Sequence, residues 1–170
     1  MPEEPQVPPN FEALPNTGNH DCFGCSPANP YGLRMKFFSG DGALFSWLTV
    51  PNHLCGWADL VHGGVLATIL DEMMGWTIIH FLKKFALTNS MTVEFHKPVR
   101  IGEQIRVEGR VLEAGGKREA TVEGLIYKAG DVLCAKSVGT FRLFTAGAIS
   151  RLGVIGEEAI KKFDFLIQPR

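Results

Sequence analysis

Two adjacent glycines give the first sign of chemistry in this chain. Gly63 and Gly64 follow His62 and directly precede a long apolar run. If that run is a helix, the glycine amides lie in its first turn, where backbone N–H groups have no acceptor inside the helix. The missing Cβ atoms and the helix dipole both favour a negatively charged oxygen at this point. The motif therefore predicts a site for an anion or an oxyanion, and its structural alternative is a tight loop against a sheet.

Asp71 lies within the same run, where an ionised carboxylate is costly unless it is paired or reaches water. Two interpretations are open. Asp71 and Glu72 form a narrow stripe that faces solvent, or Asp71 is a base or nucleophile held in a cleft. Gly63 and Asp71 are eight residues apart, which on a helix is roughly 12 Å. A base and an oxyanion donor must meet at one carbonyl group, so the two residues act together only if they come from two copies of the chain.

The elements that position these residues follow from hydrophobic periodicity. As a helix, His62 to Leu82 would be apolar on almost every face, which is typical of a helix wrapped by other structure. Lys83 and Lys84 follow it and suit a helix C-terminus. Strands are expected where apolar residues alternate or run between turn signals. The pattern predicts an α+β fold, an antiparallel sheet of about six strands around one central helix. The expected strands are Leu33–Phe38, Ala43–Val50, Thr88–Phe95, Ile105–Leu112, Lys117–Tyr127 and Val132–Phe144.

Length and composition limit the possible partners and the organisation of the chain. The 170 residues carry a formal charge of −1, which does not favour nucleic acid or an anionic membrane as a partner. We expect a proline-rich extended arm without backbone ladders over residues 1–20, one domain over 21–145, and a tail over 146–170 with a short helix near Glu157–Phe165. The start of the chain has no secretory pattern, so a cytoplasmic location is expected.

The segment His62–Asp71 resembles the signature of hotdog-fold thioesterases, in which HGG is followed by an acidic residue nine positions after the histidine. The resemblance is to the phenylacetate-pathway and THEM-like acyl-CoA thioesterases. Thr92–Glu103 is similar to the strand-then-proline segment of that family, and Cys22–Leu33 is similar to an upstream segment of one branch. The likeness extends over roughly Cys22–Phe144.

This resemblance implies an acyl-CoA thioesterase with the hotdog fold. Asp71 would be the base or nucleophile, Gly63 the oxyanion donor within the motif that His62 begins, and Thr88 the hydroxyl that orients water or the carboxylate. It implies a dimer or tetramer with sites at the subunit boundary, and no cofactor apart from the coenzyme A of the substrate. One departure is Gly56, where relatives often carry Asn or Gln.

Further residues are expected to contact the substrate. Trp57 and Met74 are candidates for lining an acyl pocket, although such side chains on a helix more often belong to the core. Basic side chains on strand ends are candidates for the coenzyme A phosphates. The expected substrate-binding residues are Gly64, Trp57, Met74, Lys117 and Arg118.

Two other functions compete with hydrolysis. A module that binds acyl-CoA without turnover is favoured by the missing polar residue at Gly56. A hotdog dehydratase or hydratase needs a catalytic histidine, for which His62 is the candidate. Release of free thiol from acyl-CoA distinguishes hydrolysis from both.

Cys22 and Cys25 form a CxxC motif, which His20, His53 or Cys55 can in principle complete as a zinc site. Structural zinc sites usually show their ligands in clear pairs, and only one pair is present here. The sequence therefore favours buried thiols and no metal. Four cysteines are also too sparse for a disulfide scaffold.

Overall fold

A computed structural model describes residues 7–16, 18, 20–116, 118–153 and 155–167. Its elements follow the expected order of two strands, a long helix and four strands, with additions at both ends. In chain order they are β1 (Glu12–Ala13), β2 (Phe38–Gly40), β3 (Ala43–Thr49), the 3-10 turn η1 (Asn52–Leu54), α1 (Gly63–Leu82), β4 (Phe85–Phe95), β5 (Gln104–Glu113), β6 (Glu119–Lys128), β7 (Val132–Phe144), α2 (Ala146–Arg151) and α3 (Glu157–Ile167).

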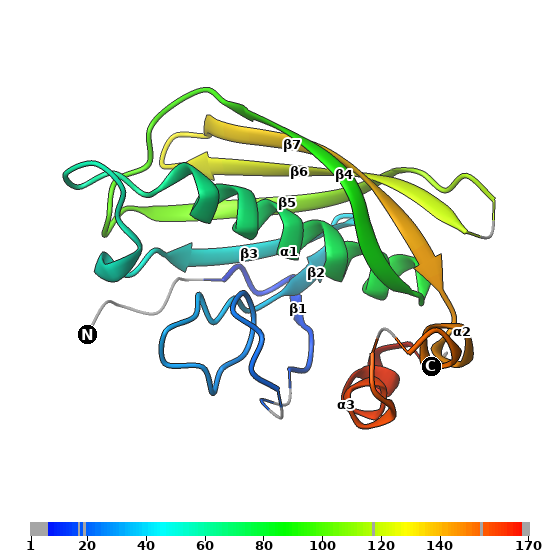
Figure 1. The fold of residues 1–170 in the computed structure, drawn as a ribbon. Helices are drawn as coiled ribbons and strands as arrows, with labels where there is room; N and C mark the ends of the chain where they lie inside the picture. Colours follow the sequence, from blue (N-terminus) through cyan, green and yellow to red (C-terminus); the bar gives the residue numbers. More distant parts are fainter. Residues whose placement is uncertain (1–6, 17, 19, 117, 154, 168–170) are drawn as a thin grey trace.

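The strands form one antiparallel sheet in the order β1-β2-β3-β5-β6-β7-β4. The sheet curves over α1, which lies along its concave face (Figure 1). The expected sheet around one central helix is confirmed. It has seven strands, since the short β1 adds to the six that were expected. The 11-residue strand β4 forms one edge of this sheet.

Close approach between α1 and the sheet depends on glycines in the middle strands. Gly109 of β5 and Gly124 of β6 are direct partners in the ladder. A Cβ atom on Gly109 would lie 2.1 Å from Oγ1 of Thr77, and one on Gly124 would lie 3.0 Å from Leu70. Without these Cβ atoms the helix packs directly on the strand backbones, which fixes the position of every residue on α1 relative to the sheet.

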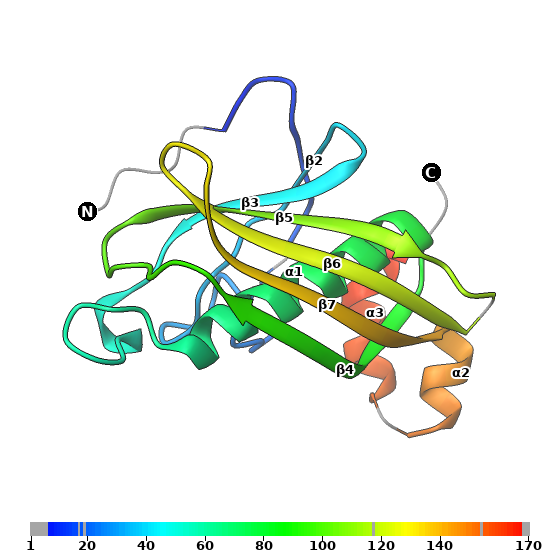
Figure 2. The same cartoon turned by 90° about the horizontal axis from the view of Figure 1, so that it is seen from above.

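The side of α1 that faces away from the sheet is covered by the N-terminal loop and by α3, as seen from both directions in Figures 1 and 2. Leu14, Cys22 and Phe163 pack against the main core from these segments. By length and hydropathy alone α1 would be able to cross a membrane. In this fold it is instead the core helix, with Ile69, Leu70, Met73 and Met74 fully buried.

Two expectations about the ends of the fold are wrong, and one helix was missed. The strand expected at Leu33–Phe38 is present only from Phe38, because the amides of Leu33 and Met35 bond to carbonyl groups of the preceding loop instead of a ladder. Part of the arm does form a ladder, since Glu12 and Ala13 pair with β2. The helix α2 was not predicted, although Thr145 supplies a cap by accepting a hydrogen bond from the amide of Ala148.

Candidate functional site

The two glycine amides in the first turn of α1 differ in their hydrogen bonding. The side chain of His62 caps the helix, and its Nδ1 atom accepts a hydrogen bond of 2.9 Å from the amide of Gly64. The carbonyl of His62 accepts from the amides of Val65 and Leu66. Among the described residues the Gly63 amide has no acceptor. The expectation of free donors on both glycines is therefore wrong for Gly64, and Gly63 is the amide left for a ligand.

A pocket of about 300 Å³ opens at Gly63. Its walls come from the segment before α1, the first turn of α1 and the residues that follow β4. Phe95 is 56% exposed at its rim, and a Cβ on Gly63 would lie 3.6 Å from this ring. The lining residues are Leu60, Val61, Gly63, Leu66, Phe95, His96, Lys97, Pro98 and Val99. The pocket places a free N–H beside an apolar wall and two side chains that can carry positive charge.

Asp71, the predicted base or nucleophile, contacts Thr88. The Thr88 hydroxyl on β4 donates a hydrogen bond of 2.7 Å to Oδ1 of Asp71 on α1. Asp71 is half-buried and Thr88 is exposed, so the carboxylate is accessible from solvent and its second oxygen is directed to no partner in the described chain. A carboxylate fixed at one oxygen and open at the other has the form of a general base or nucleophile.

Asp71 and Glu72 do not form a common solvent-facing stripe. Glu72 points to the N-terminal loop, where Cys22 donates to its carboxylate, and Trp76 of α1 donates to the same carboxylate. Burial, followed by the nearby Cys22 sulfur, raises the pKa of Glu72 to about 7. The stripe interpretation is therefore wrong, and the two neighbouring carboxylates face different surroundings.

A β-bulge in β4 aims Thr88 at α1. Thr88 pairs with Phe141 and Ser90 pairs with Thr140, so Asn89 is an extra residue in the ladder. Before the bulge Ala86 and Thr88 face the helix, whereas after it Met91 and Val93 pack against the core. The bulge thus allows both the polar contact and the apolar wall to come from the same strand.

The site residues on α1 remain separate within one chain. Gly63 and Asp71 both lie on this continuous helix, at roughly 12 Å along its axis. One chain therefore does not bring the oxyanion donor and the carboxylate to the same carbonyl group.

Other expected contacts are not supported by the structure of one chain. Met74 is 0% exposed and packs between α1 and the sheet, so it belongs to the core rather than to an open pocket. Arg118 lines a cavity of about 1070 Å³ together with Leu82, the last residue of α1. That cavity is therefore roughly 30 Å from Gly63 along the helix. Trp57 is 89% exposed and lines none of the three pockets described. Lys117 lies outside the described residues.

The structure also explains Gly56. A Cβ at this position would lie 3.2 Å from Cα of His62, so this loop passes tightly against the residue that caps α1. Two polar side chains nearby bond to other groups. Asp59 pairs with Arg100, and His53 bonds to the carbonyl of Tyr31. The described chain therefore offers no direct substitute for the polar side chain that relatives often have here.

Known proteins resemble the chain in sequence and in fold. The profile of the thioesterase superfamily matches residues 58–135. An uncharacterised protein of Schizosaccharomyces pombe is 28% identical over 116 residues, which is 66% of this chain and 65% of the yeast protein. The crystal structure of a thioesterase superfamily protein superimposes with a TM-score of 0.66 at 24% identity, covering 75% of this chain and 64% of the other. The chain thus spans slightly less than two thirds of either protein.

A third relative in fold contains a ligand. A Streptococcus mutans protein solved with bound acetyl-CoA has a TM-score of 0.58 and 18% identity, covering 83% of this chain and 94% of the other. At this identity the likeness shows a common fold.

Proposed function

We propose that this chain, which has the hotdog fold and matches the thioesterase superfamily over residues 58–135, hydrolyses acyl-CoA thioesters at a site built by two copies of the chain. The observation that carries the proposal is the accessible Asp71 carboxylate held by Thr88. The Gly63 amide, which has no acceptor in the described chain, supplies the second half of the site. The acetyl-CoA in the streptococcal relative supports the substrate class.

In the proposed reaction the thioester carbonyl oxygen accepts a hydrogen bond from Gly63 of one copy, and Asp71 comes from the other. In the base route Asp71 removes a proton from water, and the resulting hydroxide adds to the carbonyl carbon. The C–S bond then breaks, and the coenzyme A thiolate takes the proton from Asp71. In the nucleophile route Asp71 adds to the carbonyl carbon and the C–S bond breaks, which releases the coenzyme A thiolate and leaves an anhydride on Asp71. Water then opens the anhydride to give the acid and free Asp71, and a proton from this water goes to the thiolate. The negative charge on oxygen is stabilised at the helix start in both routes.

The β4 edge supports the assembly of two copies. β4 has 11 residues and, within the described part of the chain, pairs on only one side, with β7. A long unpaired edge is a template for pairing with a second chain. Asp71 lies beside this edge through its contact with Thr88, and the Gly63 pocket lies at its end through Phe95. Pairing of two β4 edges would bring the site halves of two copies toward one another.

The direct test is release of free thiol from a panel of acyl-CoA esters. We expect hydrolysis by the wild type and a loss of at least about a hundredfold in Asp71→Asn, the lower end of what a general base contributes. Asp131→Asn is the matched control, because Asp131 lies in an exposed turn and has a positive φ that asparagine tolerates. Activity of Asp71→Asn within a few-fold of wild type would contradict the catalytic role.

A mixed dimer tests whether two chains share the site. Gly63→Pro removes the proposed N–H donor, and proline is accepted here because His62 is extended, with φ −61° and ψ 135°. Gly63→Ala is its control for folding and keeps the N–H. The Gly63→Pro and Asp71→Asn homodimers should be nearly inactive. After co-refolding, each mixed dimer has one site with both substitutions and one site with neither, so activity should return. If subunit exchange is confirmed by mass spectrometry and activity does not return, the two-chain site is wrong.

A module that binds acyl-CoA without turnover is a second candidate, favoured by the absence of a polar side chain at Gly56. It predicts saturable binding of acyl-CoA with no thiol release. The dehydratase alternative receives less support, because Nδ1 of His62 already accepts the hydrogen bond that caps α1.

A further inference from the structure

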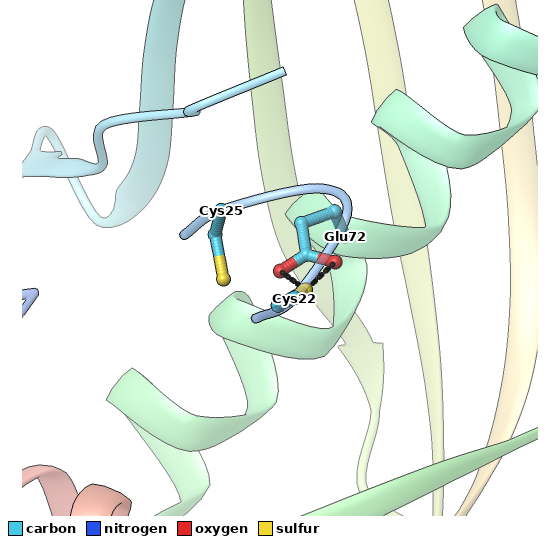
Figure 3. A group of neighbouring side chains, drawn as sticks. All are labelled: Cys22, Cys25 and Glu72. Carbon is cyan, nitrogen blue, oxygen red and sulfur yellow. Dashed lines mark hydrogen bonds between the residues drawn. The ribbon is translucent and has the colours of Figure 1, made fainter. Parts of the chain in front are cut away.

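Two thiols and a half-buried carboxylate meet on the side of α1 opposite the sheet. Cys22 and Cys25 lie on the N-terminal loop and Glu72 lies near the middle of α1 (Figure 3). One ligand atom from each residue lies within 4.8 Å of the other two. Cys25 is buried, and the other two residues are half-buried. The proposed hydrolysis uses none of these three groups.

The loop is shaped to bring its sulfur atoms to the carboxylate. The amides of Leu33 and Met35 bond to the carbonyls of Phe23 and Gly24, which fixes the turn between the two cysteines. A Cβ on Gly24 would lie 2.5 Å from Oε2 of Glu72. A larger residue here would push the Glu72 side chain away, so glycine lets the loop and the carboxylate meet.

The distances match those between ligands of one tetrahedral metal ion. Sγ of Cys22 lies 3.5 and 3.6 Å from the two carboxylate oxygens of Glu72. Zinc bonds of about 2.3 Å to sulfur and 2.0–2.2 Å to oxygen at a tetrahedral angle hold the two ligand atoms about 3.5–3.7 Å apart. Cys22 and Glu72 are therefore already at the spacing of two ligands of one ion, and the sulfur of Cys25 lies within 4.8 Å of both ligand atoms.

The Glu72 carboxylate lacks strong compensation from the protein. Among the described residues, its donors are the weakly polar thiol of Cys22 and the indole N–H of Trp76, at 3.2 Å. A bound cation would offset the buried negative charge, and the indole would then orient the ligating carboxylate from outside.

We propose that Cys22, Cys25 and Glu72 bind a divalent transition metal ion, with Zn²⁺ as the best match, and that the ion ties the N-terminal loop to α1. Two sulfur donors exclude Mg²⁺ and Ca²⁺ as preferred ions, since both select oxygen ligands. Water or the second carboxylate oxygen completes the four ligands. The ion joins residues 50 positions apart in the chain, so its role is to stabilise the fold.

The histidines and the third cysteine that the sequence offered as ligands are not part of this cluster. His20 bonds to Asn16, His53 bonds to the carbonyl of Tyr31, and Cys55 is exposed. Cys55→Ser is therefore a matched control, because it removes a thiol and leaves the cluster intact.

The test uses the full chain, stripped of metal by a chelator and kept reduced with a phosphine. Titration with Co²⁺ should produce a thiolate-to-cobalt absorption band in the near ultraviolet that saturates at one ion per chain, and Zn²⁺ should abolish it by displacement. Zn²⁺ at a hundredfold excess over its Kd should raise Tm by about 5–10 °C. Cys55→Ser should behave like the wild type.

Cys22→Ser and Glu72→Gln should each weaken Co²⁺ binding at least tenfold, and Glu72→Gln keeps the size of the side chain if the serine variant does not fold. The proposal is overturned if the reduced wild type shows no saturable Co²⁺ band, or if the band survives in the folded Glu72→Gln variant with unchanged affinity. It is also overturned if Cys55→Ser abolishes the band, or if Cys22 and Cys25 form a disulfide in air while the reduced protein takes up no metal.

Discussion

Nδ1 of His62 lies 2.9 Å from the amide nitrogen of Gly64, so the first residue of the HGG motif caps the helix that the motif begins. This contact assigns different roles to the two glycines. Gly64 supplies the donor for the cap, and Gly63 keeps an amide without an acceptor in the described chain. The position of the proposed oxyanion donor therefore depends on a side chain that need not touch the substrate.

His62→Ala should lower the stability of the protein through loss of this cap. Removal of an N-cap side chain costs about 1 kcal/mol, which corresponds to a decrease in Tm of about 2–4 °C for a chain of this length. His62→Asn should recover most of the loss, because asparagine is a strong N-cap residue. Thermal unfolding followed by circular dichroism measures both changes, and equal Tm values for the alanine and asparagine variants would contradict the capping role.

Thr88→Val should reduce catalysis without altering the fold. The substitution keeps the shape of the side chain and removes the hydroxyl that donates to Asp71. A hydrogen bond to a charged group contributes about 1.5–3 kcal/mol, so we expect kcat/KM to fall by roughly 10- to 100-fold. Thr92→Val is the control, since Thr92 is exposed on the same strand. Equal effects of the two substitutions would count against a special role for Thr88.

Deletion of Asn89 should disrupt the site and the core together. Without the extra residue, either Thr88 turns away from Asp71 or Met91 turns away from the core, because a shift of one residue reverses the faces of a strand. We expect loss of activity and a lower Tm. Asn89→Ala keeps the residue count and should retain the bulge. Normal activity and stability in the deletion variant would show that the bulge does not position Thr88.

The chain should be a dimer or larger assembly in solution. The unpaired β4 edge and the separation of Gly63 from Asp71 both favour two copies. Sedimentation equilibrium at micromolar concentration should give at least twice the chain mass of 18.7 kDa. A single species at the monomer mass would leave the proposed site incomplete.

Hydrophobic runs and their flanking residues were enough to predict the long helix and the last strand. The apolar run and its flanking residues predicted α1 to within one residue, and Val132–Phe144 matches β7 at both ends. In the apolar run at Leu33–Phe38, Leu33, Met35 and Phe37 are buried. The run does not indicate a strand here, because the backbone partners of this segment are set by a distant loop rather than by its own periodicity.

The contacts of the site depended on pairings that no local pattern contains. Thr88 was expected near Asp71 from the family resemblance, but the bulge at Asn89 that aims it depends on the register between β4 and β7. Glu72 appeared equivalent to its neighbour Asp71 in the sequence. Its approach to Cys22 arises only when the N-terminal loop folds back over α1, so the sequence could not distinguish the two carboxylates.

The apolar character of α1 has a consequence for synthesis of the chain. The helix ends at Leu82, whereas the strands β5, β6 and β7 that cover it follow later, up to Phe144. At about 5–20 residues per second the ribosome leaves this segment without its sheet for several seconds. During that interval the nascent chain presents a helix with the length and hydropathy of a membrane span. Chaperones that hold apolar segments, and signal-recognition factors that direct them to membranes, therefore compete for this chain before its own sheet exists.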